Sequence, residues 1–319
     1  MTNKLKEISD FLIRKNNFHI LTHVNPDGDA VGSALALCFG LIDIGKNSQV
    51  ICSVPEKFKF LKENFQEIIV GDPEVIICVD TADRNLIVNG DKYSKIDICI
   101  DHHVSNSNYS DIVYNDPNVS ANTENIYKLL KFMKIEIDAQ IAKCIYTGIV
   151  CDTGRFKFSN VTSQTFAISS EILPKIDNFE NLNRKIFDNK SKNYMAFLGE
   201  VIKNCEYYFE DKCALISVSI NLMNKFNLIY EEIEEISSIP LKISGIEFGV
   251  TIKEKSENFY KVSVRTSNKK ALEICKKFGG GGHEDAGGFE ISGNFSEIKN
   301  KILNEIKKII TNAGQVIFI

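Results

Sequence analysis

The sequence predicts an α/β protein: an N-terminal domain with a doubly wound, mainly parallel sheet, then a helical linker and a smaller α+β C-terminal domain. Three observations predict this class. The chain has 319 residues, whereas one domain usually takes roughly 100–200. Short apolar runs alternate with helical periodicity in the first half, which is typical of parallel sheets. Beyond residue 209, strand-like segments and a hairpin signal take over. We place the domains at residues 1–187, 188–209 and 210–319.

The N-terminal domain combines amphipathic helices with apolar runs that are polar only at their ends. Such runs are typical of strands buried on both faces of a parallel sheet. The predicted elements are, in order, a helix at 5–12, a strand at 18–21, a helix at 31–42 that ends near Gly45, strands at 49–52, 68–70, 75–79 and 96–100, and helices at 123–133 and 139–150. His19 lies between Phe18 and Ile20 inside a strand, so we interpret it as structural.

The C-terminal domain changes in character. Residues 187–209 are helical and mixed, as expected of a connection between domains. The predicted elements that follow are strands at 214–220, 246–253 and 259–265, a hairpin turn at 254–258, a helix at 271–278, a strand at 288–291 and a Lys/Glu-rich helix at 295–310. The acidic run at 231–235 is interpreted as a solvated helix face without a catalytic role.

Composition excludes several classes of protein. The chain carries 38 basic and 42 acidic residues, a formal charge of −4, which is wrong for a protein that coats duplex DNA. No run of about 18 apolar residues exists, and the first twenty residues carry charges throughout, so neither a membrane span nor a secretory signal is expected. Nine cysteines are scattered without a C-x-x-C pair, which favours the reduced cytoplasm.

Acidic and imidazole side chains follow four separate apolar segments. In chain order they are His23, Asp27 and Asp29, then Asp80, then Asp101, His102 and His103, then Asp152. Taken alone, Asp27-Gly28-Asp29 reads as a turn and a helix cap. However, the carboxyl ends of parallel strands meet at one edge of a sheet, where ligands bind. We therefore expect these side chains to converge on one site.

Four carboxylates in one site repel each other. At an effective dielectric of 20, each pair about 4 Å apart costs roughly 4 kcal/mol. Either some are protonated or cations lie among them, and two divalent ions would offset four charges. Oxygen-rich sites with some imidazole suit manganese, magnesium or ferrous iron. Two such ions stabilise in-line displacement at phosphorus, so the sequence predicts a phosphoesterase.

A second candidate site combines the glycine run 279–282 with His283 and Arg265. Consecutive glycines permit positive φ and let backbone N–H groups close around an anion. Read alone, the glycines describe a flexible hinge. Strand alternation puts Tyr260, Val262 and Val264 on one face and Lys261, Ser263 and Arg265 on the other. On that second face, Arg265 is either a phosphate ligand or a solvated strand end. We expect Arg265, Gly280, Gly281, Gly282 and His283 to bind substrate.

These motifs resemble those of the DHH phosphoesterases, and the glycine–histidine motif with Arg265 resembles the C-terminal domain associated with that family. The resemblance covers residues from about 18 to 293. It implies that His23, Asp27 and Asp80 hold one metal ion, usually manganese, with magnesium as the alternative. It further implies that Asp29, Asp80, His102 and Asp152 hold the second, that His103 faces the scissile phosphate and that Asp101 orients the imidazoles. Residues 284–287 are more acidic here than is common in relatives.

Within the family, the chain resembles the stand-alone bacterial enzymes that act on short RNA. The implied activity is manganese-dependent hydrolysis of short oligoribonucleotides and of 3′-phosphoadenosine 5′-phosphate (pAp) by a two-metal-activated hydroxide. A cleft closed by the C-terminal domain would favour short substrates. The alternatives are a phosphodiesterase for pApA or cyclic di-AMP and, from another class, a non-hydrolytic nucleotide sensor. No duplex DNA and no membrane is expected as a partner, and a homodimer is allowed.

Overall fold

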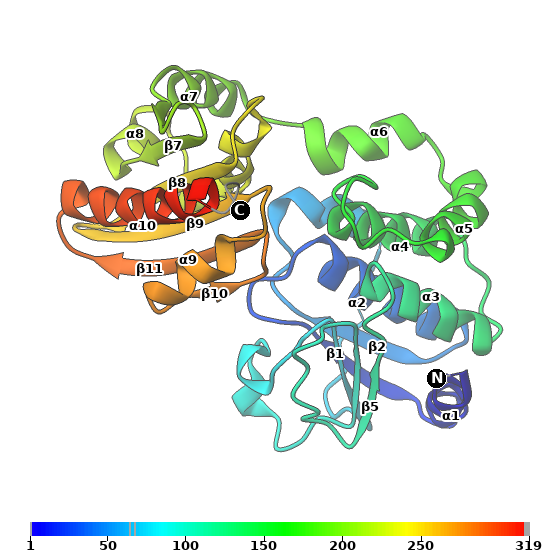
Figure 1. The fold of residues 1–319 in the computed structure, drawn as a ribbon. Helices are drawn as coiled ribbons and strands as arrows, with labels where there is room; N and C mark the ends of the chain where they lie inside the picture. Colours follow the sequence, from blue (N-terminus) through cyan, green and yellow to red (C-terminus); the bar gives the residue numbers. More distant parts are fainter. Residues whose placement is uncertain (1, 64, 67, 316–319) are drawn as a thin grey trace. The chain divides into compact units, whose positions relative to one another are not determined.

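The computed structural model describes residues 2–63, 65–66 and 68–315, and it divides the chain into two compact units (Figure 1). Unit 1 is Met1–Asn189 and unit 2 is Lys190–Ile319. Each unit has its own sheet. The predicted α/β class is confirmed, with a parallel sheet in the first unit and a mixed sheet in the second.

Unit 1 is built on a five-stranded sheet in which every neighbouring pair is parallel. Its strands are β1 (Asn17–Leu21), β2 (Asn47–Ile51), β3 (Val75–Val79), β4 (Ile98–Asp101) and β5 (Ile112–Asn115). Their order is β2-β1-β3-β4-β5. In this doubly wound order the chain reverses direction between β1 and β3, and ligands bind at the carboxyl ends of the strands at such a switch point.

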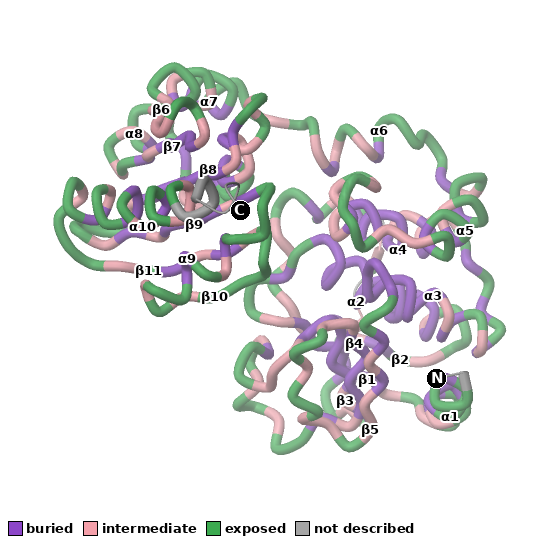
Figure 2. Tube along the Cα trace, viewed as in Figure 1, coloured by how far each residue is buried: buried purple, intermediate pink, exposed green. Residues whose placement is uncertain are grey.

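The α-helices of unit 1 pack with the main core on one face of this sheet. They include α1 (Thr2–Ile13), α2 (Gly28–Asp43), α3 (Asn122–Phe132) and α4 (Ala139–Asp152). Figure 2 shows α2 buried along nearly its whole length, in keeping with its small apolar residues. Helices α2 and α4 can approach closely because Gly32 has no Cβ. A Cβ at this position would lie 2.5 Å from the carbonyl oxygen of Cys144.

The opposite face of the sheet carries a smaller apolar cluster. It includes Ile87 and Ile96, which belong to the connection between β3 and β4. That connection has no segment of α-helical length and forms the 3₁₀ turns η2 (Arg84–Leu86) and η3 (Gly90–Lys92). The remaining elements of unit 1 are η1 (Glu56–Lys62), α5 (Ser163–Ile172), η4 (Leu173–Lys175), α6 (Phe179–Asn183) and η5 (Arg184–Asp188).

The strands of unit 1 differ from the predicted ones at two places. Residues 68–70 form no strand; instead, the Val70 carbonyl accepts a hydrogen bond from His19 Nε2 at 2.7 Å. The ring of His19 also contacts the Tyr93 hydroxyl at 2.9 Å, which confirms its structural role. Strand β5 was not predicted, because its few apolar residues stand between polar ones at the edge of the sheet.

Unit 2 has a six-stranded sheet of order β10-β11-β9-β8-β7-β6, in which only β7 and β8 pair in parallel. Its strands are β6 (Glu206–Tyr208), β7 (Cys213–Val218), β8 (Phe248–Ser256), β9 (Phe259–Thr266), β10 (Gly281–Gly282) and β11 (Ala286–Ser292). Its helices are α7 (Lys192–Lys203), α8 (Ile220–Lys225), η6 (Tyr230–Ser238), η7 (Pro240–Lys242), α9 (Ala271–Lys277) and α10 (Phe295–Gln315).

The two faces of this sheet bury different clusters. Tyr260, Val262 and Val264 of β9 pack with α9 and α10, as the alternation predicts. On the other face, α7 and η6 pack against β7. Helix α7 lies in the segment for which the sequence predicts a linker, but Tyr194, Phe197 and Val201 bury it within unit 2. Of the helices in the described part of the chain, none is long and apolar enough to cross a membrane.

Candidate metal centre

The loop after β1 brings His23 and Asp27 to the carboxyl edge of the sheet. Asp27 is the N-cap of α2, since its Oδ1 accepts hydrogen bonds from the backbone N–H groups of Asp29 (2.9 Å) and Ala30 (3.1 Å). The cap is therefore Asp27, although the sequence suggested Asp29. Ligand atoms of His23, Asp27 and Asp80 all lie within 4.8 Å of one another. Burial lowers the pKa of the His23 imidazole, which favours the neutral form that metals bind.

Asp29 is fully buried, and its carboxylate binds the start of a helix that is distant in sequence. Its carboxylate accepts hydrogen bonds from the backbone N–H groups of Asn122 (2.5 Å) and Thr123 (2.9 Å). These two N–H groups lie in the first turn of α3, and the side chain of its N-cap residue Ala121 has no acceptor for them. Asp29 thus places its charge at the positive end of α3. Burial nevertheless raises the pKa of Asp29.

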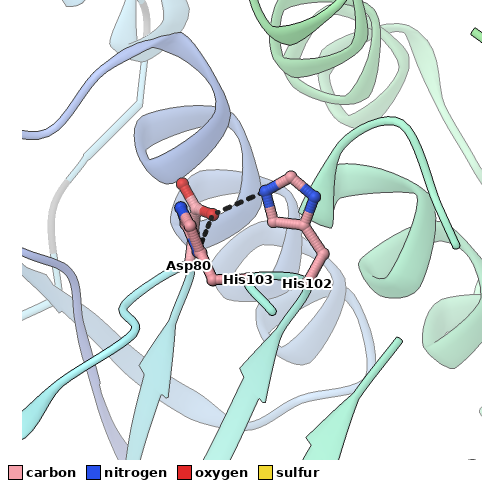
Figure 3. Close-up of side chains that lie close together, drawn as sticks. All are labelled: Asp80, His102 and His103. Atoms are coloured by element: carbon pink, nitrogen blue, oxygen red, sulfur yellow. Dashed lines mark ion pairs between the residues drawn. The ribbon is translucent and has the colours of Figure 1, made fainter. Parts of the chain in front are cut away.

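Asp80 follows β3 directly, on the other side of the switch point from the β1 loop. Its backbone has φ of +52°, a left-handed conformation that non-glycine residues adopt rarely and that clusters at functional sites. Its Oδ1 is buried and has no hydrogen-bond partner among the described residues; it lies 3.4 Å from His102 Nε2 and 3.8 Å from His103 Nδ1 (Figure 3). Burial, and next the carboxylate of Asp29, raise the pKa of Asp80 well above its usual value.

Asp101 ends β4 and supports the two histidines that follow it. Its carboxylate accepts hydrogen bonds from His103 Nδ1 at 2.7 Å and from Asn106 Nδ2 at 2.6 Å. Burial works to raise the pKa of Asp101, but the hydrogen bond from His103 leads the contributions that lower it below its usual value. With Nδ1 engaged in this way, Nε2 is the ring nitrogen that His103 has left for a ligand.

His102 and Asp152 close the other side of the cluster. His102 Nε2 lies 3.4 Å from Asp152 Oδ2 and 3.8 Å from Asp29 Oδ2. Asp152 arrives at the C-terminal end of α4, so here a helix delivers a residue that we had grouped with the strand ends. Burial, and then the charge of Asp29, raise the pKa of Asp152 to about 9.

The cluster fits divalent cations. Three overlapping groups of side chains each hold their ligand atoms within 4.8 Å: His23, Asp27 and Asp80; Asp29, His102 and Asp152; and Asp80, His102 and His103. Together they contain every residue expected as a metal ligand. Without cations, buried carboxylates at this spacing keep protons, as the raised pKa values of Asp80 and Asp152 indicate. Cations would remove this repulsion and give the unpartnered Asp80 Oδ1 a ligand.

Sequence reasoning missed the residues that hold these side chains in place. They are Asn106, which binds Asp101; Asn122 and Thr123, which bind Asp29; and Asn125, whose Nδ2 binds the Asp101 carbonyl at 3.1 Å. Their contacts span up to 94 positions of the chain, so no local pattern identifies them. The one usable signal was Ala121, a poor N-cap before a helix.

The second candidate site lies within unit 2. Arg265 of β9 is the register partner of Ala286 in β11, and β10 pairs with the same strand, so Arg265 and the glycine segment are neighbours. The glycines form a tight ribbon and not an open loop: a Cβ at Gly280 or Gly282 would collide with backbone carbonyls of β11. His283 is exposed.

Several N–H groups expected to close around an anion are already used. Gly279 N donates to the Lys276 carbonyl at 3.2 Å, Gly280 N to that of Cys275 at 2.9 Å and His283 N to that of Ala286 at 2.7 Å. The physical reason for the glycines is therefore close approach of two backbones, in addition to the positive φ of Gly279 and Gly282.

Comparison with known proteins assigns a family to each of the two units. The DHH family N-terminal domain model matches residues 17–149, and the DHHA1 domain model matches residues 213–312. The chain is 30% identical to the probable bifunctional oligoribonuclease and PAP phosphatase NrnA of Streptococcus mutans, covering 90% of this chain and 93% of the relative. It is 27% identical to the bifunctional oligoribonuclease and PAP phosphatase NrnA of Thermus thermophilus, covering 93% and 91%.

A solved structure extends the similarity to the fold. An exopolyphosphatase-related protein from Bacteroides fragilis superposes with a TM-score of 0.88 at 27% identity, covering 98% of both chains. The chain therefore belongs to the DHH family of phosphoesterases, carries a DHHA1 domain and is a hydrolase of phosphoester bonds.

Proposed function

We propose that the protein is a manganese-dependent phosphoesterase that hydrolyses short oligoribonucleotides and pAp. One observation carries the proposal: six side chains from four distant segments converge in unit 1 with the donor set of a two-cation site. They are His23, Asp27, Asp29, Asp80, His102 and Asp152. Four carboxylates and two imidazoles favour manganese, with magnesium as the alternative.

In this proposal His23, Asp27 and Asp80 hold one cation, and Asp29, Asp80, His102 and Asp152 hold the other. When bound, the two cations stabilise the attacking and leaving oxygens of an in-line displacement at phosphorus. Asp80 is the ligand common to both, which is supported by its grouping with His23 and Asp27 of the first set and with His102 of the second.

His103 contacts the scissile phosphate, and Asp101 positions it. The 2.7 Å hydrogen bond to Asp101 orients the ring and, as its main contribution, raises the pKa of His103. A histidine that retains its proton better is suited to neutralise charge on a phosphoryl oxygen. His103 is also partly exposed, with 40% of its side chain accessible, as a substrate contact requires.

We assign metal binding and catalysis to unit 1 and substrate binding to unit 2. Arg265 would bind a phosphate through its guanidinium fork. Of the ribbon Gly280, Gly281 and Gly282, only Gly281 has open space around its Cα, and the ribbon would contact substrate there. The exposed His283 would contact the nucleotide. The negative charge of Asp285 interacts with the Arg265 guanidinium and would weaken its binding to phosphate.

The substrate class is tested with a panel. Purified protein with Mn²⁺ is given a diribonucleotide, a twenty-nucleotide RNA, pAp, pApA and cyclic di-AMP, and products are separated by chromatography. We expect turnover of the diribonucleotide, pAp and pApA, with the twenty-nucleotide RNA much slower. The relatives named oligoribonuclease and PAP phosphatase support this choice. Preferential cleavage of cyclic di-AMP would support the alternative phosphodiesterase, and no turnover of any substrate would support a sensor.

Cation binding should also stabilise unit 1. For a site filled at 100 times its Kd, the gain is about 2.7 kcal/mol, which corresponds to roughly 5–10 °C in Tm. We expect a rise of this size when Mn²⁺ is added to chelator-treated protein, followed by scanning calorimetry. Asp80→Asn should show less than half of the rise, whereas Asp83→Asn, at the N-cap of η2 and outside the metal-binding groups, should show all of it. Equal shifts in the two variants would contradict the assigned ligands.

A further inference from the structure

A cluster of positively charged side chains lies in unit 2, on the sheet face opposite α9 and α10. Lys253 of β8 and Lys261 of β9 are register partners, and Arg265 lies four residues further along β9. Alternation puts all three on the face away from Val262 and Val264. Lys253 is only 2% exposed, whereas Lys261 is partly exposed.

Lys253 lacks a counter-ion within the described part of the chain. It has neither an ion pair nor a hydrogen bond there; its ammonium lies 4.9 Å from the centre of the Tyr230 ring. Burial, and next the charge of Lys261, lower the pKa of Lys253 to about 8, and the nearby Glu234 offsets this only in part. A buried ammonium without a paired acceptor is unfavourable, so an anion bound beside Lys253 would stabilise its charged form.

A second carboxylate near the cluster, besides Glu234, is used elsewhere. Glu290 of β11 is the register partner of Lys261, but its Oε1 binds Lys255 Nζ at 2.7 Å. Two buried hydroxyls on the same side of the sheet, Thr251 Oγ1 and that of Tyr230, also have no hydrogen-bond partner within residues 2–63, 65–66 and 68–315. Thr251 is two residues before Lys253 on the same face, so it would serve an anion bound there.

Between the lysine pair and Arg265 this face of the sheet is polar, although Thr251 and Ser263 are themselves buried. Thr251, Ser263 and Gly288 are in register across β8, β9 and β11, midway between the lysine pair and Arg265. Four residues of strand separate Lys261 from Arg265, about 13 Å at roughly 3.3 Å per residue. A mononucleotide is too short to reach both ends of this strip, whereas a strand of several nucleotides is long enough.

We propose that Lys253 and Lys261, with Thr251, form a second phosphate subsite in unit 2 that binds a backbone phosphate of an oligoribonucleotide other than the one held by Arg265. This inference rests on the proposed function and adds a length preference to it. Lys261 is the outer member of the subsite and Lys253 the inner one. The subsite contributes to binding of RNA of several nucleotides and not to binding of pAp.

The test uses the full chain and tetra-adenylate with a 3′-terminal fluorophore. Binding is followed by fluorescence anisotropy in a chelator, so that the RNA is not cleaved, at several salt concentrations. We expect Lys253→Met and Lys261→Met each to raise the Kd for tetra-adenylate about tenfold. Each should also reduce the slope of log Kd against log salt by about 0.7, the value for one lost contact to a single strand. Their KM for pAp with Mn²⁺ should stay within twofold of wild type.

Lys212→Met is the matched control, since Lys212 is an exposed lysine of unit 2 that pairs with Glu247 at 3.5 Å; it should bind as wild type. Lys253→Met should unfold at the same or a higher temperature, because it removes an unpaired buried charge. If it unfolds earlier, the partly exposed Lys261→Met decides the outcome. Variants that bind tetra-adenylate like wild type, with an unchanged salt slope, overturn the subsite alone. A wild-type protein that hydrolyses neither short RNA nor pAp overturns the proposed function.

Discussion

Asp80→Asn is expected to lower Mn²⁺-dependent hydrolysis by at least about 10³-fold, equivalent to about 4 kcal/mol of transition-state stabilisation. The physical reason is that the ligand atoms of Asp80 lie close to those of His23 and Asp27 and also to that of His102, so its loss would affect both proposed cations. The variant should still fold. Asparagine tolerates the left-handed backbone at this position, and removing an unpartnered buried carboxylate costs no hydrogen bond at Oδ1. The measurement is kcat/KM for pAp together with Tm in the absence of metal.

The matched control is Asp83→Asn, three residues further along. Asp83 caps the turn η2 by accepting a hydrogen bond from Asn85 N at 2.9 Å and is not in any of the metal-binding groups. Its activity should remain within twofold of wild type. If Asp80→Asn kept more than a tenth of the activity, the two-cation assignment would be wrong.

Gly148→Ala is expected to damage both stability and activity. A Cβ at Gly148 would lie 2.5 Å from Asp29 Oδ1 and 2.5 Å from Thr123 Oγ1. Neither neighbour can yield easily, because the carboxylate of Asp29 is held by the start of α3. Overpacking of this kind costs about 1–3 kcal/mol, and a displacement near 1 Å at the site lowers the rate by about 10²-fold. Denaturant unfolding and kcat/KM for pAp measure the two effects.

Gly199→Ala supplies the comparison for that variant. Gly199 lies on the exposed side of α7, and a Cβ there would meet nothing within 4 Å. The substitution should therefore stabilise the protein by about 0.5–1 kcal/mol through helix propensity and leave activity unchanged. A Gly148→Ala protein with wild-type stability and turnover would show that Asp29 need not stay where it is.

The sequence predicted most of the elements for a simple reason. Buried strands such as β1 and β3 are largely continuous apolar runs, and α1 and α10 have clear helical periodicity. The predictions that did not match lie where the local pattern is weak. Residues 68–70 are apolar but serve as a loop that accepts a hydrogen bond from His19, and β5 is a short edge strand.

The convergence of the candidate metal-binding side chains could also be predicted, because chemistry concentrates at the carboxyl ends of parallel strands. His23 lies two residues after the end of β1, and Asp80 directly follows β3. Asp101 is the last residue of β4. Asp152 was identified for a partly mistaken reason. It reaches the cluster because α4 packs along α2 and ends there, not because a strand ends at that edge.

The sequence by itself determined which residue types meet and at which sheet edge, since strand direction and the order of apolar runs are local properties. Only the tertiary structure decided that Asp27 caps α2 while Asp29 caps α3, that Asn106 supports Asp101, and that Lys253 is buried without a counter-ion. Each of these depends on side chains from elements that are distant along the chain. Their hydrogen bonds and burial arise only when helices and strands pack, and no pattern within one element records them.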